Sequence, residues 1–138
     1  MNLVLDIGNT LLKAGLFKKN VQINYFEFKN NYYEKIRNIL ERNLILYSIV
    51  SNVSKTENKL IQLLKIKTQF IPFNSSLKIP FKNLYKSKRT LGQDRIALVS
   101  SSMKHFPDEN VLIIDLGSCI TYDFINSKNE YEGGAISP

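Results

Sequence analysis

A short pattern occurs twice in the chain and constrains the fold more than any other feature. Residues 3–10 and 112–119 are each an apolar run followed by Asp, an aliphatic residue, Gly and a small polar residue. Each copy continues into a second apolar run. The pattern predicts a strand–turn–strand unit that is used twice. One copy alone would be ordinary hairpin chemistry, whereas two copies in the same strand context favour a duplicated ligand-binding turn.

The residue types of the two turns are suited to phosphate and to a cation. Gly8 lets the backbone turn tightly and approach a phosphate with no Cβ in the way. Asp6 and Asp115, at the strand ends, can each hold a cation, or water bound to one, that neutralises phosphate charge. Lys13 lies close enough to add a positive charge. Short polar groups beside the turn N–H groups come from Asn9, Thr10 and Ser118.

Two common nucleotide-binding motifs do not occur in the chain. The sequence contains no G-x-x-x-x-G-K-[ST], which excludes a P-loop. It also contains no G-x-G-x-x-G, so a Rossmann dinucleotide site has no support. The repeated turn is therefore the candidate phosphate site.

Hydrophobic periodicity predicts an α/β chain. Strands are predicted at residues 3–7, 11–17, 21–28, 44–50, 70–73, 111–114 and 120–125, with a last one from Tyr131. Helices are predicted over residues 30–42, around Leu60 to Leu64, and from residues 92–95 through Phe106. Residues 74–90, which include Pro80 and many polar side chains, are predicted to be a loop over the site. This order predicts a ribonuclease-H-like domain, as in actin-like kinases, over residues 1–108, and the start of a second copy over residues 109–138.

A third motif, Gly92-Gln93-Asp94-Arg95, precedes the last predicted helix. Asp94 would lie in the first helical turn, where the helix dipole favours an ionised carboxylate. Such a carboxylate can accept the proton of an attacking hydroxyl in phosphoryl transfer. Arg95 could bind a substrate carboxylate through a bidentate contact. From these four residues alone, an ordinary helix start with a surface arginine is the favoured interpretation.

Composition excludes several classes of function. The net charge is +7, but the lysines are spread along the chain, and the densest run, residues 86–89, has no RNA-binding aromatic motif beside it, so a solvated basic surface is favoured over nucleic-acid binding. The single cysteine, Cys119, and the single histidine, His105, provide neither an internal disulfide nor the usual zinc spacings. No apolar run approaches a membrane span, and Asp6 interrupts the first one, so a soluble cytoplasmic protein that binds no membrane is expected.

The three motifs, taken in order, resemble the type III pantothenate kinases. The set comprises Asp6-Ile7-Gly8-Asn9-Thr10 with Lys13, then Gly92-Gln93-Asp94-Arg95, then Asp115-Leu116-Gly117-Ser118 leading to the segment Tyr131–Pro138. Each motif alone is weak, but the ordered set is specific. The resemblance runs along the whole chain.

The resemblance implies a kinase that uses ATP, Mg²⁺ and a monovalent cation, K⁺ or NH₄⁺, to phosphorylate pantothenate in the first step of coenzyme A synthesis. It implies that Asp94 is the proton acceptor, that Asp115 binds the monovalent cation, and that Ser118 contacts ATP. The remaining ATP phosphate contacts would come from Asp6, Ile7, Gly8, Asn9, Thr10, Leu11, Leu12 and Lys13. Pantothenate contacts would come from Tyr85, Gly92, Gln93, Asp94 and Arg95. The family implies two ribonuclease-H-like domains and a homodimer with pantothenate near the subunit interface.

Three departures from the family pattern stand out. Gln93 occupies a position that is commonly Ala, and Ser118 replaces a usual Thr but keeps the hydroxyl. Family members are also commonly much longer, so the chain is expected to end early in the second domain and to leave apolar strand faces uncovered. Two alternatives stay open: a non-catalytic ATP-binding or regulatory relative of the family, and an actin-like kinase for another small alcohol.

Overall fold

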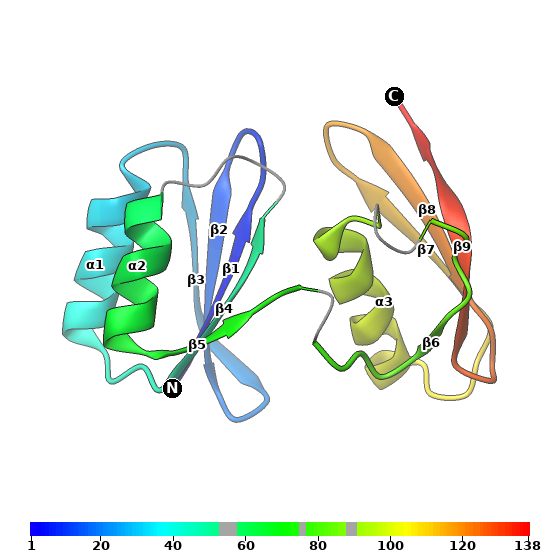
Figure 1. Ribbon diagram of the computed structural model, residues 1–138, viewed down its shortest axis with the longest axis horizontal. Coiled ribbons are helices and arrows are strands. Elements are labelled where there is room, and N and C mark those ends of the chain that lie inside the picture. Colours follow the sequence, from blue (N-terminus) through cyan, green and yellow to red (C-terminus); the bar gives the residue numbers. More distant parts are fainter. Residues whose placement is uncertain (53–57, 75–76, 88–90) are drawn as a thin grey trace. The chain divides into compact units, whose positions relative to one another are not determined.

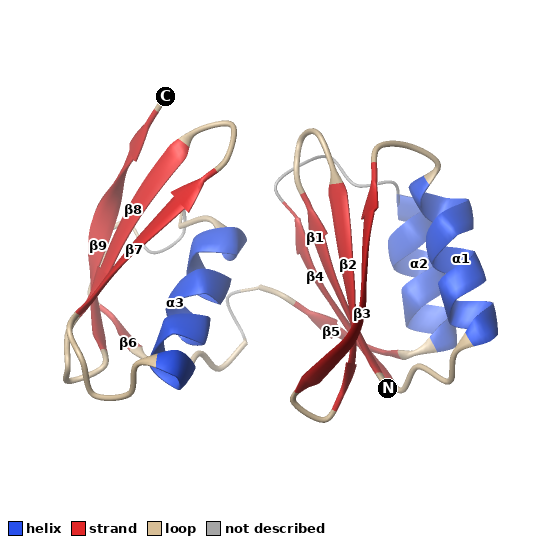
Figure 2. Ribbon diagram, turned by 180° about the vertical axis from the view of Figure 1, so that it is seen from behind, coloured by secondary structure: helices blue, strands red, loops and turns tan. Residues whose placement is uncertain are grey.

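The chain forms two compact units, Met1–Asn74 and Ser75–Pro138, in a computed structural model that describes residues 1–52, 58–74, 77–87 and 91–138. Over these described ranges, each unit contains one mixed sheet, with two helices packed on one face of the first sheet and one helix on one face of the second (Figure 2). The chain is therefore of the mixed α/β class, as the periodicity predicts.

The first unit has the strand order of a ribonuclease-H-like domain (Figure 1). Its elements are β1 (Asn2–Ile7), β2 (Leu12–Lys18), β3 (Val21–Phe28), α1 (Tyr32–Arg42), β4 (Tyr47–Asn52), α2 (Asn58–Lys67) and β5 (Gln69–Pro72). The sheet order is β3-β2-β1-β4-β5. The first three strands pair antiparallel, while β4 and β5 add in parallel on the other side of β1. The end of β1 thus lies where the sheet changes from antiparallel to parallel pairing.

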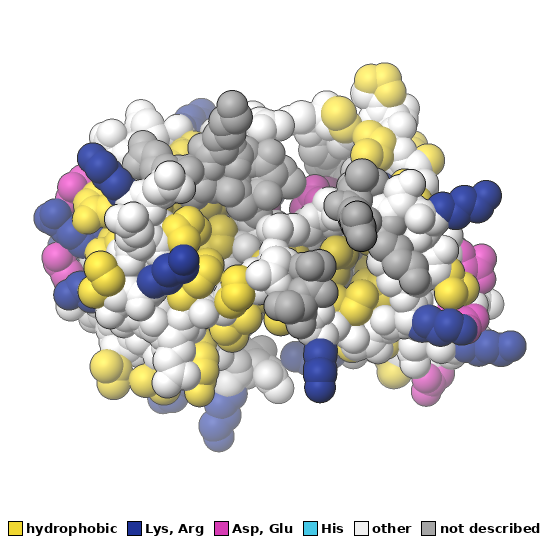
Figure 3. Space-filling model, viewed as in Figure 1, with side chains coloured by type: hydrophobic (Ala, Val, Ile, Leu, Met, Phe, Trp, Pro, Cys, Tyr) yellow, Lys and Arg dark blue, Asp and Glu magenta, His cyan; other side chains and the backbone are white. Residues whose placement is uncertain are grey.

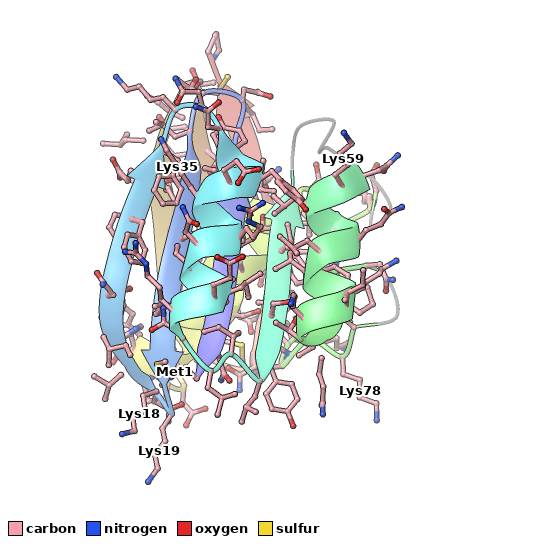
Figure 4. The ribbon with its side chains drawn as sticks, turned by 90° about the vertical axis from the view of Figure 1, so that its left-hand side faces the viewer. Met1, Lys18, Lys19, Lys35, Lys59 and Lys78 are labelled. Carbon is pink, nitrogen blue, oxygen red and sulfur yellow. The ribbon has the colours of Figure 1, made fainter. Side chains whose placement is uncertain are left out.

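Alternation along the strands forms the core of the first unit. Leu3, Leu5 and Ile7 are 0%, 0% and 2% exposed, because every second side chain of β1 faces the helical layer. Helices α1 and α2 lie side by side on that face (Figure 4). Each fully buried aliphatic side chain contributes about 1.5–3 kcal/mol relative to an exposed one. The helical layer supplies the buried residues Ile36, Ile39, Leu60 and Leu64.

Basic side chains are dispersed over the surface. Lys18 is the last residue of β2 and Lys19 follows it, Lys35 lies on α1 and Lys59 on α2 (Figure 4). On the face shown in Figure 3, Lys and Arg side chains occur on both units, several of them beside Asp or Glu. This agrees with the spread of lysines along the sequence. Within the described residues, no helix is both long and apolar enough to cross a bilayer.

The second unit is a smaller sheet with one helix. Its elements are β6 (Lys82–Asn83), α3 (Gln93–His105), β7 (Val111–Leu116), β8 (Ile120–Ile125) and β9 (Glu130–Ser137). The sheet order is β6-β9-β8-β7, with β6 parallel to β9 and the other pairs antiparallel. Helix α3 packs against β7 and β8. The buried apolar core consists of Phe81, Leu91, Val99, Ile125 and Tyr131.

Two details differ from the sequence-based expectations. The two compact units meet in the sequence between Asn74 and Ser75, whereas the sequence predicts the domain boundary at residue 108. The difference arises because α3 packs on the sheet that contains β7 and β8. The predicted loop over residues 74–90 contains β6, which pairs with β9, and Phe81 beside it is buried. Residues 75–76 and 88–90 of that loop lie outside the described part of the chain.

The two copies of the repeat have the same strand pairing but different surroundings. Leu112, Ile114 and Leu116 of β7 correspond to the three buried residues of β1, yet they are 60%, 52% and 76% exposed. In the described residues of the second unit, α3 covers the opposite face of the sheet. Strand β7 is also an edge strand. An apolar row on an open edge favours association.

We expect the 138-residue chain to self-associate through β7. Replacing Leu112 and Ile114 together with Thr keeps strand propensity and removes much of the exposed apolar area, so the mass measured by sedimentation velocity should fall toward the monomer value of 15.9 kDa. Val21→Thr, at a position of β3 that is 65% exposed, is the matched control and should leave association unchanged. A monodisperse wild-type monomer at high concentration would contradict the expectation.

Candidate functional site

Both predicted turns are present, at the ends of equivalent hairpins. In the first, Ile7 pairs with Leu12, so residues 8–11 form the turn, and the Gly8 N–H donates to the Leu11 carbonyl oxygen at 3.0 Å. In the second, Leu116 pairs with Ile120, so residues 117–119 form a turn that is one residue shorter. There the Gly117 N–H donates to the Cys119 carbonyl oxygen at 3.1 Å. The repeat is therefore structural, with a difference in turn length.

The first turn separates its predicted ATP-contacting residues into two groups. Ile7 and Leu12 are 2% and 0% exposed, so their side chains belong to the core and only their backbone is available to a ligand. Asp6 and Lys13 face each other across β1 and β2. The remaining side chains at the turn, of Asn9, Thr10 and, in part, Leu11, are open to solvent. The turn therefore has polar, solvent-accessible side chains at its tip and buried apolar side chains where it joins the two strands.

The fold itself does not require glycine at either turn. A Cβ built on Gly8 would lie 3.4 Å from the Leu11 carbonyl oxygen, and one on Gly117 would lie 3.6 Å from that of Cys119. Both distances are ordinary contacts. Packing within the described chain therefore gives no reason for glycine at either turn.

The start of α3 holds the predicted proton acceptor. Gly92 is the N-cap, and the Asp94 Oδ1 accepts a hydrogen bond from the backbone N–H of Arg95 at 2.9 Å. A Cβ on Gly92 would lie 2.3 Å from that oxygen. Glycine at position 92 therefore makes room for the Asp94 carboxylate, which is partly exposed at a helix N-terminus where a negative charge is stabilised.

Arg95 is buried rather than on the surface. Its side chain is bound to Asp123 of β8, with Nε at 3.0 Å and Nη2 at 2.7 Å from Oδ1, and Nε at 3.1 Å from Oδ2. The sequence suggested that Arg95 binds a substrate carboxylate through two contacts. In the structure, the carboxylate that Arg95 binds in this way is the side chain of Asp123 in the same unit. Breaking such a buried ion pair by removing one partner costs about 3–5 kcal/mol.

Two tyrosines complete the surroundings of Arg95. The Tyr131 hydroxyl donates to the Asp123 Oδ1 at 2.5 Å and accepts from the Arg95 Nη2 at 3.2 Å. The Tyr85 ring centroid lies 5.7 Å from the Arg95 Cζ and 6.1 Å from the centroid of the Tyr131 ring. The predicted substrate residues Tyr85, Asp94 and Arg95 therefore gather at one place in the second unit.

Protonation states follow from this packing. Burial, followed by the hydrogen bond to Asp123, raises the pKa of Tyr131 well above its usual value. The hydrogen bond to Asp123 likewise raises the pKa of Arg95. The guanidinium and the neutral phenol are thus the stable forms.

The backbone of β9 approaches Arg95 closely at Gly134. A Cβ at this position would lie 1.7 Å from the Tyr122 carbonyl oxygen and 2.8 Å from the Arg95 Nη2. The first is a clash with backbone and cannot be relieved by a side-chain rotation. Glycine at position 134 is therefore required by the packing of β9 against β8 and Arg95.

The second turn offers donors for a cation. Asp115 pairs with Thr121, and Ile113 pairs with Asp123, so Asp115, Thr121 and Asp123 share the sheet face that α3 covers. The Thr121 Oγ1 is buried and has no hydrogen-bond partner among the described residues. Asp115 and Ser118 are exposed. In the described ranges no group of three or more His, Cys, Asp or Glu side chains could hold a metal ion.

Asp123 and Tyr131 were not predicted as site residues. Their partner, Arg95, lies 28 and 36 positions away along the chain. The one available signal was a carboxylate in the middle of the apolar run 120–125, since a charge in a buried strand needs a partner. Arg95, which follows the predicted proton acceptor, is one cation that could have been considered as that partner.

Gly134→Ala should destabilise the protein by at least about 2 kcal/mol, because the added methyl group overlaps the Tyr122 carbonyl. Gly8→Ala is the matched control and should change the free energy of unfolding by less than about 1 kcal/mol. Urea denaturation followed by circular dichroism measures both. Equal stability of the two variants would contradict the packing of β9 described above.

The raised pKa of Tyr131 predicts a pH dependence of stability. Because the folded state favours the neutral phenol, this contribution is complete below the usual tyrosine pKa of 10.0 and is lost as the pH rises toward the higher folded-state pKa. The free energy of unfolding should therefore decrease as the pH rises above about 10, and by less in Tyr131→Phe than in the wild type. Parallel pH profiles for the two proteins would refute this expectation.

Known proteins resemble the chain over its whole length. The family model described as type III pantothenate kinase matches residues 2–138. Type III pantothenate kinases of Christiangramia forsetii, Flavobacterium psychrophilum and Bacteroides fragilis are 41%, 39% and 36% identical, each over 100% of this chain. The chain spans 57–58% of the length of these relatives.

Solved structures agree on the fold. A Campylobacter jejuni protein assigned to the Baf family of transcriptional activators is 26% identical, with a TM-score of 0.57 over 99% of this chain and 54% of that one. A Porphyromonas gingivalis protein assigned as an N-acetylglucosamine kinase is 12% identical, with a TM-score of 0.50 over 98% of this chain and 47% of that one, and it shows the fold alone. With its paired Asp-Gly turns, the gathering of Tyr85, Asp94 and Arg95, and the match over residues 2–138, the chain belongs to the type III pantothenate kinase family.

Proposed function

We propose that this protein transfers the γ-phosphoryl group of ATP to the 4′-hydroxyl of pantothenate, which gives ADP and 4′-phosphopantothenate in the first step of coenzyme A synthesis. The observation that carries the proposal is the gathering of Tyr85, Asp94 and Arg95 at the start of α3. It occurs in a chain whose family match extends over residues 2–138. The relatives bear the name of this activity.

Asp94 is the proposed proton acceptor. As the 4′-oxygen attacks the γ-phosphorus and the bond to the β-phosphate oxygen breaks, the hydroxyl proton passes to the Asp94 carboxylate. The carboxylate is partly exposed, is bonded to the Arg95 N–H, and lies at the positive end of a helix dipole. Tyr85 and the segment Gly92-Gln93-Asp94-Arg95 contact pantothenate. Because its Nε and Nη2 are bound to Asp123, Arg95 contacts the substrate with the rest of its side chain or orients its neighbours.

The turns at Gly8 and Gly117 are the proposed nucleotide contacts. Backbone N–H groups and the side chains of Asn9, Thr10 and Ser118 donate to phosphate oxygens, and Lys13 neutralises charge. Asp6 and Asp115 would hold Mg²⁺ and the monovalent cation, K⁺ or NH₄⁺, with phosphate oxygens and water as further ligands. The exposed carboxylate of Asp115 beside the unpartnered Thr121 Oγ1 is suited to that role. When bound, the cations supply positive charge that offsets the charge of the transferring phosphoryl group.

The proposal includes a cytoplasmic homodimer with pantothenate near the subunit interface, as the family resemblance implies. An alternative is a regulatory role without catalysis. The one observation that favours it is the resemblance to the Campylobacter jejuni protein assigned to a transcriptional activator family. The two functions make opposite predictions for turnover.

Pantothenate-dependent release of ADP is the direct test, with ATP, Mg²⁺ and K⁺ present. Asp94→Asn should lower kcat by about 10²–10⁴-fold, because it removes the group that accepts the proton. The matched control is Asp108→Asn, an exposed acid in the segment after α3 whose backbone φ of 60° suits Asn as well as Asp. It should retain full activity.

Circular dichroism of each variant would check that it is folded. Activity that survives Asp94→Asn would overturn the assignment of the proton acceptor. A folded protein that releases no ADP in response to pantothenate would overturn the proposed function and favour the regulatory alternative.

A further inference from the structure

Three buried polar side chains of the second unit are bound to one another, and two of them, Asp123 and Tyr131, have no role in the proposed transfer. Arg95 of α3, Asp123 of β8 and Tyr131 of β9 are 5%, 0% and 0% exposed. They come from three different elements and are bonded to one another at 2.5–3.2 Å. Each pair within the trio is connected directly, so the arrangement closes on itself.

Burying these three polar side chains carries a desolvation cost that apolar side chains at the same positions would not have. A buried ion pair must offset the desolvation of both charges, and replacing it with well-packed apolar side chains is often neutral or stabilising. The unit has apolar side chains beside the trio that could extend the core, including Val99 and Ile125. Stability alone therefore does not explain why these three residues are present. The need for a fixed geometry would explain them, because a bidentate contact sets both the position and the orientation of the guanidinium.

The geometry is transmitted to Asp94 through one residue. The Arg95 side chain is held by Asp123, while the backbone N–H of the same residue donates to the Asp94 Oδ1 at 2.9 Å. Successive residues of a helix point about 100° apart, so the anchor of Arg95 in the sheet turns Asp94 away from it. Glycine at position 92 leaves the space into which this carboxylate folds. The buried trio thus fixes one side of the first turn of α3, and Asp94 lies on a different side of that turn.

We propose that Asp123 and Tyr131 are positioning residues for Asp94. They lock the guanidinium of Arg95, and the locked residue in turn holds the Asp94 carboxylate in place through its N–H group. Neither residue needs to touch the substrates. The inference rests on the proposed function for its effect on turnover, but the order of the Asp94 carboxylate can be measured without any turnover.

Tyr131→Phe is the primary variant, since it removes only the hydroxyl group and keeps the ring in the core. Asp123→Asn is the second variant, since it keeps the shape of the side chain and removes its charge. Glu130→Gln is the matched control. It weakens the contact of Glu130 with Lys82, 2.8 Å long, on the same strand β9 but outside the trio. All measurements are made below the melting temperature of each variant.

The first arm follows the Arg95 amide by NMR hydrogen exchange in the absence of substrates. Its resonance is identified by its shift in Asp94→Asn, which changes the acceptor. In Tyr131→Phe and Asp123→Asn the exchange should be at least about tenfold faster, whereas Glu130→Gln should leave it unchanged. Unchanged exchange in both trio variants would overturn the inference, whatever the enzyme activity.

The second arm separates kcat from KM. A misplaced proton acceptor slows the chemical step, so kcat should fall by about 10- to 100-fold in the trio variants while the KM for ATP stays within about twofold. A purely structural role would lower the melting temperature and leave kcat of the folded protein unchanged, and that result would also overturn the inference. A wild type without turnover would refute the proposed function, and the first arm would then decide the inference alone.

Discussion

A buried guanidinium joins the helix and the sheet of the second unit, and the candidate site is arranged around it. A charge that is almost fully buried is stable only with a matched partner, and Arg95 has Asp123 on one strand and Tyr131 on the next. The β9 backbone passes close to it at Gly134, where no side chain would fit. These constraints together determine where α3 begins relative to the sheet. They therefore determine where Asp94 and the following helical residues lie.

The duplicated hairpin shows how one sequence pattern can have two packing outcomes. The strand pairing is retained, since β1 and β7 each pair antiparallel with the next strand and end in a Gly turn. The apolar residues of β1 lie beneath two helices, whereas the equivalent residues of β7 are exposed in the described structure. Pairing depends on backbone hydrogen bonds within the hairpin. Burial depends on what the rest of the chain places against the sheet.

Much of the secondary structure could be predicted from local patterns. The bounds predicted for residues 21–28 and 120–125 agree with β3 and β8, and the helix predicted for residues 30–42 begins two residues late, at Tyr32. Strand β6 could not be predicted, because it is two residues long and forms only through a parallel pairing with β9, 48 positions further along. A segment so short carries no periodicity of its own.

For the candidate site, the sequence by itself determined the residue types at each turn, the helix start that carries Asp94, and the family to which their order points. These features are local. An Asp at the end of an apolar strand, a Gly turn after it, and an acidic residue in a first helical turn all depend on neighbours a few positions away. The partner of Arg95 was decided only by the tertiary structure, which buries a side chain that the motif alone placed on the surface. Strand register and the packing of α3 on β7 and β8 bring together groups far apart in the chain. Because a buried charge has to be paired where it lies, that packing selected Asp123 as its partner.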